Sequence, residues 1–523
     1  MQGRNWVLAA MIFAVSMTFI DQTIVSIAVP NIQRELGLTS TGVQWVVNGY
    51  LISLAALFAL GGRLSDIFGH TKMCVIGVIV FVVASAMCGL TPKGSGAEAW
   101  IVTFRVVQGA GGALMFPAAL AIVVNTFPLR QRGKALALFF GIAGGLTAIG
   151  PLLGGFLTEW TWRAIFWVNI PVALIALLLI AVSKPKTQYQ RAPIDYRGAV
   201  LIAAGIGLSV FGLQQSVPWG WSNPWTWICI FAGLIIIGVF VAVEARTESP
   251  LIKVKIFRIR PFAMENLVLL IAMMAFIPVF FFASEYAQIA LRDSASGAGI
   301  FLLWFFIGFV IAAQIGGRIL DREGAKRAVV LGCAIAAVGF GFWASKVTTL
   351  SFSKQEIWII VAGFGMGMML GPANTDAVNR AGNLSYGEAT GITQTIRNLG
   401  ASLGLAALGT TLLFSYRSHL TASLKAKNFP HPAALANSIS QTQQAPRGSQ
   451  SQQAQVKDIL QIVPGDFAHA TAVVLYVMCG IMAFAAVVAL FGLQRGRQEV
   501  APVEDVAPAG PAAPAAPIPA APA

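Results

Sequence analysis

Long apolar runs recur along the whole chain, and each is long enough to cross a membrane as a helix. A crossing helix needs about 20 mostly apolar residues, because roughly 30 Å of hydrocarbon is spanned at about 1.5 Å per residue. The pattern therefore predicts an all-α membrane protein. Its fourteen expected spans lie near residues 7–29, 44–62, 74–90, 100–124, 135–157, 164–183, 198–216, 226–243, 262–287, 298–317, 328–345, 355–378, 389–414 and 470–493.

The composition agrees with a lipid environment. Hydrophobic residues make up 57% of the 523 residues and charged residues only 11%, and the mean hydropathy is +0.74. A soluble domain carries about 25% charged residues. The composition thus excludes an ordinary water-soluble enzyme, a nucleic-acid-binding domain and a disordered scaffold.

The placement of the positive charge predicts the orientation. With the N-terminus in the cytoplasm, most of the 35 Lys and Arg residues fall in inner connections such as 130–134 and 253–260, and few in the short outer ones. Cytoplasmic loops of membrane proteins carry this excess. We expect a multi-pass protein of the cytoplasmic (inner) membrane with both termini in the cytoplasm. The net charge of +14 then needs no nucleic-acid partner.

The sequence offers no constellation for enzyme chemistry. The five cysteines lie in apolar segments at irregular spacings, without a CxxC pair or a Cys/His cluster. Neither a metal site, a disulfide framework nor a cofactor is therefore expected. A nucleophile–base arrangement and a GxxxxGK[ST] phosphate loop are also missing from the sequence, so a membrane enzyme or sensor is the least favoured hypothesis.

One polar motif occurs twice, on the connection between the second and third spans of each half. Its members are Gly62, Asp66 and Gly69 in the first copy and Gly317, Asp321, Arg322 and Gly324 in the second. Glycines permit a tight turn, and a carboxylate beside basic side chains can hold one helix end against another. We expect gating loops here, or simply tight turns in water. Parallel repeats are typical of transporters whose substrate path lies between the halves.

The repeat also predicts the domain organisation. We expect an N-terminal six-helix half over 5–183, two inserted helices with cytoplasmic linkers over 184–260, and a C-terminal six-helix half over 261–495. Residues 415–469, rich in Gln, Ser and Ala, are expected to form a long outer loop, and the Ala/Pro-rich residues 496–523 a disordered tail.

These motifs resemble the major facilitator superfamily, and the fourteen spans resemble its drug:proton antiporter branch. Residues 62–69 look like the superfamily signature, and four further stretches resemble motifs of the branch: 20–30, 105–113, 141–155 and 162–171. The resemblance covers roughly residues 5–495. It implies the major-facilitator fold and proton-driven export by alternating access. It also implies proton-coupling roles for Asp21 and Arg105, and an antiporter motif made of Gly141, Gly145, Gly150, Pro151, Gly154 and Gly155.

The depth of Asp21 and Arg105 gives an independent reason to pair them. Asp21 lies roughly 21 Å along the first span and Arg105 roughly 28 Å from the cytoplasmic end of the fourth, so their depths agree within about 7 Å. An ionised side chain in hydrocarbon costs at least about 2.5–3.5 kcal/mol. We expect the two to share a polar cavity in which proton and cationic cargo compete for one carboxylate. Packing roles for both residues remain the alternative.

Candidates for the substrate path are polar or aromatic residues inside or at the ends of spans. They are Glu265, Glu285, Gln288, Trp45, Tyr50, Phe116, Tyr286 and Arg397. Interfacial or packing roles are the alternative for the acids and aromatics. Asp376 and Glu388 flank an inner connection, and we expect both in solvent.

Two export hypotheses remain. The first is a proton-coupled exporter of lipophilic, cationic, drug-like compounds, and the second is an exporter of an endogenous metabolite, lipid or siderophore on the same fold. The partners expected are an amphipathic small molecule, protons and the lipid bilayer. A periplasmic adaptor is a further candidate if the host has an outer membrane. The glycine-dense fifth span would form a tight, bendable seam that limits leak, or merely pack closely.

Overall fold

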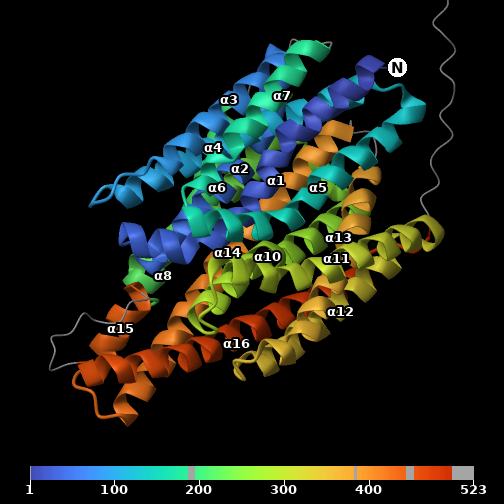
Figure 1. The fold of residues 1–523 in the computed structure, drawn as a ribbon. Coiled ribbons are helices and arrows are strands. Elements are labelled where there is room, and N and C mark those ends of the chain that lie inside the picture. The colour runs from blue at the N-terminus through green and yellow to red at the C-terminus, as the bar shows by residue number, and fades with distance from the viewer. Residues whose placement is uncertain (1, 186–194, 382–385, 443–452, 497–523) are drawn as a thin grey trace, which may run out of the picture.

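The computed structural model describes residues 2–185, 195–381, 386–442 and 453–496, and these residues form helices and short connections without a β-strand (Figure 1). Within this part of the chain, fourteen helices are long and apolar enough to cross a membrane. The number of spans expected from the hydropathy pattern is therefore confirmed. The short N-terminal piece of the sixth span is a separate turn of helix, which joins α7 to form one crossing segment.

The helices follow one another with short connections. The first group comprises α1 (Gln2–Leu36), α2 (Ser40–Phe68), α3 (His70–Gly89), α4 (Ala97–Thr126), α5 (Leu129–Trp160), α6 (Ala164–Trp167) and α7 (Asn169–Ser183). Two further long helices are α8 (Tyr196–Trp219) and α9 (Pro224–Glu244), followed by the 3-10 helix η1 (Val254–Arg258). The last group comprises α10 (Arg260–Ile289), α11 (Ala295–Glu323), α12 (Ala325–Val347), the 3-10 helix η2 (Phe352–Lys354), α13 (Glu356–Asn379), α14 (Tyr386–Ala426), α15 (Pro432–Thr442) and α16 (Gln453–Gly492).

Glycines end the helices at both copies of the repeated motif. Gly69 separates α2 from α3 with a φ of 96°, and Gly324 separates α11 from α12 with a φ of 89°. Residues with a side chain rarely adopt this left-handed backbone. The second glycine of each motif copy therefore stands where the chain reverses between two spans.

The segment 415–469, expected to form a long outer loop with some helix near 454–462, is largely helical in the described residues. Helix α14 continues to Ala426, α15 follows, and α16 already begins at Gln453. Tyr416, Leu420 and Leu424 recur every four residues and are all buried, which gives the extended α14 an apolar face to pack. Residues 443–452 and most of the expected tail, 497–523, lie outside the described residues.

The helix α8 lies against both the first and the last group. It packs on α2 and α14, and α9 packs on α8. Asn48 of α2 donates a hydrogen bond from Nδ2 to Oε1 of Gln214 at 2.9 Å, which places the polar end of α8 inside the protein. In contrast, few side chains of α9 are buried, as expected for a helix whose surface faces lipid.

The first and last groups of helices meet closely at one end of the molecule, which we call the closed end. Gln288 of α10 donates from Nε2 to the backbone oxygen of Ile27 of α1 at 2.8 Å, and Ser40 of α2 donates to the backbone oxygen of Ser440 of α15 at 2.9 Å. The N-terminus of α1 and the helix α15 lie at opposite ends of the bundle (Figure 1). The closed end is therefore the end away from the N-terminus.

Candidate functional site

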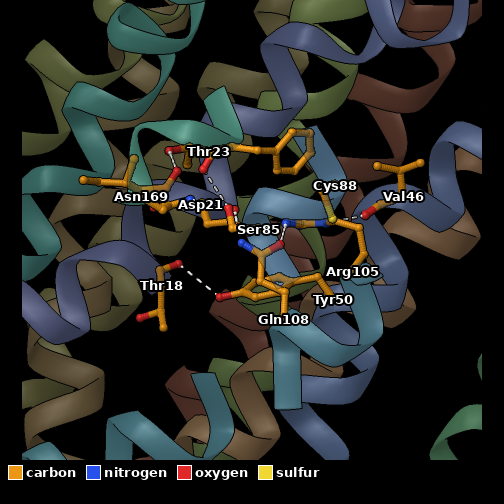
Figure 2. Close-up of polar contacts among 12 residues, drawn as sticks. Thr18, Asp21, Thr23, Val46, Tyr50, Ser85, Cys88, Arg105, Gln108 and Asn169 are labelled. Atoms are coloured by element: carbon orange, nitrogen blue, oxygen red, sulfur yellow. Dashed lines mark hydrogen bonds and ion pairs between the residues drawn. The ribbon is translucent and has the colours of Figure 1, made fainter. Parts of the chain in front are cut away.

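Asp21 of α1 and Arg105 of α4 form a direct ion pair inside the first group of helices (Figure 2). Nη1 of Arg105 lies 2.5 Å from Oδ2 of Asp21, and the side chains are 1% and 0% exposed, respectively. Gln108, one turn further along α4, donates from Nε2 to Oδ1 of Asp21 at 2.9 Å and accepts from Nη1 of Arg105 at 2.7 Å. The three side chains thus form a closed triangle of hydrogen bonds.

The guanidinium group of Arg105 makes further contacts with the protein. Nε of Arg105 donates to the backbone oxygen of Val46 at 2.8 Å, and its central carbon lies 4.5 Å from the ring centre of Tyr50. The hydroxyl of Tyr50 reaches the backbone oxygen of Thr18 at 3.4 Å (Figure 2). A guanidinium over an aromatic face gains electrostatic attraction from the ring. Helices α1, α2 and α4 are joined at this point.

The pairing of Asp21 with Arg105 agrees with their predicted depths, but the surroundings differ from the expected cavity. Both side chains are packed by protein, so no cargo molecule reaches the carboxylate in this conformation. A buried ion pair is held by mutual attraction and hydrogen bonds that offset the loss of water. The arrangement can therefore respond to a proton on Asp21, because protonation would leave the arginine without its counter-charge.

Gln108 is the member of this site that the sequence did not single out. It stands three residues after Arg105, and residues three apart share one face of a helix. That spacing was the available signal. It identifies a neighbour of the arginine, although it does not show that the amide would contact Asp21 on another helix.

A second group of charged residues lies in the last group of helices. Glu265 of α10 is buried, and its carboxyl neighbours the carboxyl of Asp376 of α13. Asp376 accepts a hydrogen bond from Nε of Arg380 at 2.6 Å. The expectation that Asp376 lies in solvent is wrong, because its side chain is 3% exposed and turns toward α10. Glu388 is 40% exposed and pairs with Lys253 at 2.9 Å, as expected for a residue near water.

The candidates at the C-terminal end of α10 lie at the closed end. Gln288 bonds the backbone of α1, and Glu285 is buried one turn earlier. Tyr286 is fully buried and donates to the backbone oxygen of Val347 at 2.7 Å, while Gln355 donates to its hydroxyl at 2.8 Å. Tyr286 therefore anchors α10 to its neighbours within the last group.

The remaining candidates are dispersed. Trp45 packs against Phe211 of α8, with ring centres 5.8 Å apart. Phe116 is buried in a group of phenylalanines that includes Phe58, 5.3 Å away. Arg397 lies in α14, and its Nη1 donates to Gln394 at 2.7 Å. The structure thus does not gather the predicted path residues at one site.

The two copies of the repeated motif have different surroundings. Asp66 is partly buried and lies 3.9 Å from Nδ1 of His70, whereas Asp321 and Arg322 are both exposed. Gly62 is partly buried beside Pro117 of α4, and a Cβ built on Gly317 would meet open space. The aspartate of the first copy is thus less exposed than that of the second.

The glycines of the fifth span form close contacts on two sides. Gly150 and Gly154 approach α1, where a Cβ on Gly154 would lie 2.9 Å from the backbone oxygen of Ile24. Gly155 faces α11, where a Cβ would lie 2.6 Å from the backbone oxygen of Ala295. Pro151 is part of the same contact, because its backbone oxygen would be 2.7 Å from a Cβ on Gly299 of α11. A Cβ on Gly145 would meet open space, and the surroundings of Gly141 lie outside the described residues.

A cavity of about 560 Å³ lies between α8, α14 and α16. Trp221, Phe414 and His419 are among its lining residues, and it includes none of the path residues predicted from the sequence. Among the described residues, no group of three or more His, Cys, Asp or Glu side chains is placed to hold a metal ion.

A bundle of fourteen apolar helices with buried charged pairs is the architecture of a multi-pass membrane transporter. The sequence model of the Major Facilitator Superfamily matches residues 11–405, and the chain belongs to this family. The family consists of transporters, so the chain is a transporter and not an enzyme.

Individual relatives agree with this assignment. A tetracenomycin C resistance and export protein of Streptomyces glaucescens is 33% identical over 414 residues, which cover 78% of this chain and 76% of the relative. Multidrug resistance protein 3 of Bacillus subtilis is 27% identical over 78% of this chain and 79% of its own length. The crystal structure of a D-xylose–proton symporter matches with a TM-score of 0.59 over 94% of this chain and 98% of the symporter. At 13% identity this last likeness concerns the fold alone.

Proposed function

We propose that the chain is a proton-coupled exporter of lipophilic, cationic compounds that works by alternating access. The observation that carries the proposal is the buried ion pair of Asp21 and Arg105 in a member of a transporter family. Relatives named for antibiotic export and multidrug resistance support the direction of transport and the class of cargo.

The ion pair suggests how a proton could be coupled to movement. A proton on Asp21 removes the counter-charge of Arg105, which then keeps neutral partners such as the backbone oxygen of Val46, the amide oxygen of Gln108 and the face of Tyr50. An unpaired buried charge is costly, so protonation favours a rearrangement of α4 against α1. In the conformation described here, Arg105 occupies the position that a cationic cargo would need at the carboxylate.

The orientation follows from the distribution of Lys and Arg along the chain. We place the protein in the cytoplasmic membrane with both termini inside the cell, so that the closed end faces outward. The halves 5–183 and 261–495 then rock about the inserted pair of helices. We assign the path residues Glu285 and Gln288 to the outer seal, together with the α5–α11 contact. The repeated motif loops gate the inner end. Binding of a periplasmic adaptor, in a host with an outer membrane, stays a prediction.

Transport into everted membrane vesicles tests the coupling. With an acidic vesicle interior, the wild-type protein should accumulate a fluorescent lipophilic cation. The Asp21→Asn variant should lose this accumulation to the level of vesicles without the protein, because the amide neither takes up nor releases a proton at these pH values, although its oxygen can still accept a hydrogen bond from Arg105.

Asp293→Asn is the matched control, because Asp293 is an exposed acid in the connection between α10 and α11. It should accumulate the cation like the wild type. Accumulation by Asp21→Asn at the wild-type rate, with the same dependence on the proton gradient, would show that the assigned role is wrong.

A second candidate is the export of a compound made by the host cell itself. It is favoured by the relative named for the export of a single antibiotic, tetracenomycin C. A deletion strain that retains a cell-made compound, with vesicles that ignore lipophilic cations, would favour this alternative.

A further inference from the structure

Glu265 is a buried acidic side chain for which the described part of the chain supplies no hydrogen-bond donor. It stands in the second turn of α10 and is 1% exposed. Among the described residues, no donor reaches either of its carboxylate oxygens. Burying an ionised carboxylate in this way is strongly unfavourable, since neither water nor a donor compensates the charge.

The group nearest to this carboxyl is another acid. The side chains of Glu265 and Asp376 are neighbours where α10 packs against α13. Nε of Arg380 already donates a hydrogen bond to Oδ2 of Asp376, at 2.6 Å. Two carboxylates in contact cannot both be ionised at low cost, and one proton between them both removes a charge and supplies the missing donor.

Among the described residues, the other elements around Glu265 supply no second positive charge that acts on it. From α12 the neighbouring titratable group is the thiol of Cys333, and Gln494, which follows the end of α16, accepts a hydrogen bond from Nη1 of Arg380 at 2.9 Å. Helix α14 passes α10 where Gly400 meets Leu270 and carries Arg397, whose Nη1 bonds Gln394. Arg380 is thus the cation that acts on the two acids, and it is bonded to Asp376.

We propose that Glu265 and Asp376 form a proton-binding site in the last group of helices, separate from the pair in the first group. Glu265 holds the proton and donates its O–H to a carboxylate oxygen of Asp376, which stays ionised and bonded to Arg380. Release of the proton leaves two carboxylates facing one guanidinium. The proposal deepens the proposed function, because each half of an exporter would then carry a protonatable carboxyl.

The position of Arg380 gives this site a route to water. Its side chain is 15% exposed, whereas that of Asp376 is 3% exposed, so the chain from Glu265 through Asp376 to Arg380 runs from the interior toward the surface. Glu265 lies near the N-terminal end of α10, while Gln288 at the closed end belongs to the last turns of the same helix. The proton would therefore exchange with the side away from the closed end.

Infrared difference spectra of the purified full-length protein in lipid, recorded between acidic and alkaline pH, test the site without any transport. A protonated carboxyl group has a carbonyl stretch that a carboxylate lacks. Comparison with the wild type should show that Glu265→Gln loses the band of one carboxyl group. Asp376→Asn should lose it too, because the amide removes the like charge and offers Glu265 a donor. Glu323→Gln, a change at an exposed acid of α11, should keep the band.

Two results would overturn the proposal. One is a spectrum of folded Glu265→Gln or Asp376→Asn that matches the wild type, and the other is displacement of the band by Na⁺ at constant pH, which would make the site a metal-cation site. The two proposals can fail separately. If Glu265→Gln leaves the spectrum unchanged while Asp21→Asn abolishes uptake into vesicles, only the Glu265 site is rejected. Normal uptake by Asp21→Asn would reject the proposed coupling and leave the Glu265 site standing.

Discussion

At the scale of single residues, one neutral side chain holds the two charges of the candidate site together. The amide nitrogen of Gln108 donates a hydrogen bond to Asp21, and its amide oxygen accepts one from Arg105. Hydrogen bonds to charged groups contribute about 1.5–3 kcal/mol each. Gln108 should therefore matter for stability as well as for coupling.

Replacing Gln108 by leucine tests this contribution. Gln108→Leu keeps roughly the same volume but deprives Asp21 of a donor and Arg105 of an acceptor, which should destabilise the protein by about 2 kcal/mol or more. We expect a lower melting temperature of the purified protein in detergent and slower cation export in vesicles.

Gln131→Leu, at an exposed position near the start of α5, controls for the change of residue type. It should melt like the wild type. Equal melting temperatures for Gln108→Leu and Gln131→Leu would mean that the amide contributes no net stability to the ion pair.

At the scale of helices, the seam between α5 and α11 depends on the absence of side chains. Gly155 and Gly299 lie on opposite sides of it, and a Cβ on either would come within 2.7 Å of a backbone oxygen of the other helix. Small residues allow such close approach between membrane helices. The seam is part of the closed end, so its tightness sets how well that end seals.

A single methyl group should loosen this seam. Gly155→Ala forces the two helices apart, and overpacking of this kind costs about 1–3 kcal/mol. We expect a lower melting temperature and slower export. Gly207→Ala in α8, where a Cβ would meet open space, should be neutral or slightly stabilising, because alanine favours helix more than glycine does. Identical behaviour of the two variants would contradict the tight seam.

At the scale of the whole molecule, the two groups of helices must separate at the closed end for alternating access to occur. Glu159 of α5 and Ser296 of α11 are hydrogen-bonded across this end. A covalent link between these positions should therefore hold the molecule in the conformation described here.

The Glu159→Cys, Ser296→Cys double variant tests the movement. Export in vesicles should be lost after treatment with a thiol cross-linker and recovered when a reducible linker is cleaved. The test is made with the partly exposed Cys229 and Cys479 replaced by alanine, and each single variant should then keep its activity under the same treatment, since the remaining native Cys74, Cys88 and Cys333 are buried. Undiminished export by the fully cross-linked double variant would exclude opening at this end as a step of transport.

The sequence alone was sufficient for the class of protein and for the spans. Apolar runs of helical length can be placed in lipid only as helices, because hydrocarbon offers no partner for an open backbone. The spans are therefore a local property, readable segment by segment. The helix ends at Gly69 and Gly324 are also a local property, because the positive φ of each glycine ends a helix whatever packs around it. The continuation of α14 beyond residue 414 was missed because its polar composition hid the buried stripe of Tyr416, Leu420 and Leu424.

Only the tertiary structure decided which side chains meet. The depths of Asp21 and Arg105 could be estimated from the sequence because rise per residue is constant, but the rotation of α4 that brings Gln108 onto the same carboxylate could not. Asp376 was expected in water from its position near a connection, and packing of α13 against α10 buried it beside Glu265. Contacts between helices depend on rotation and tilt, which the packing of all fourteen spans determines together.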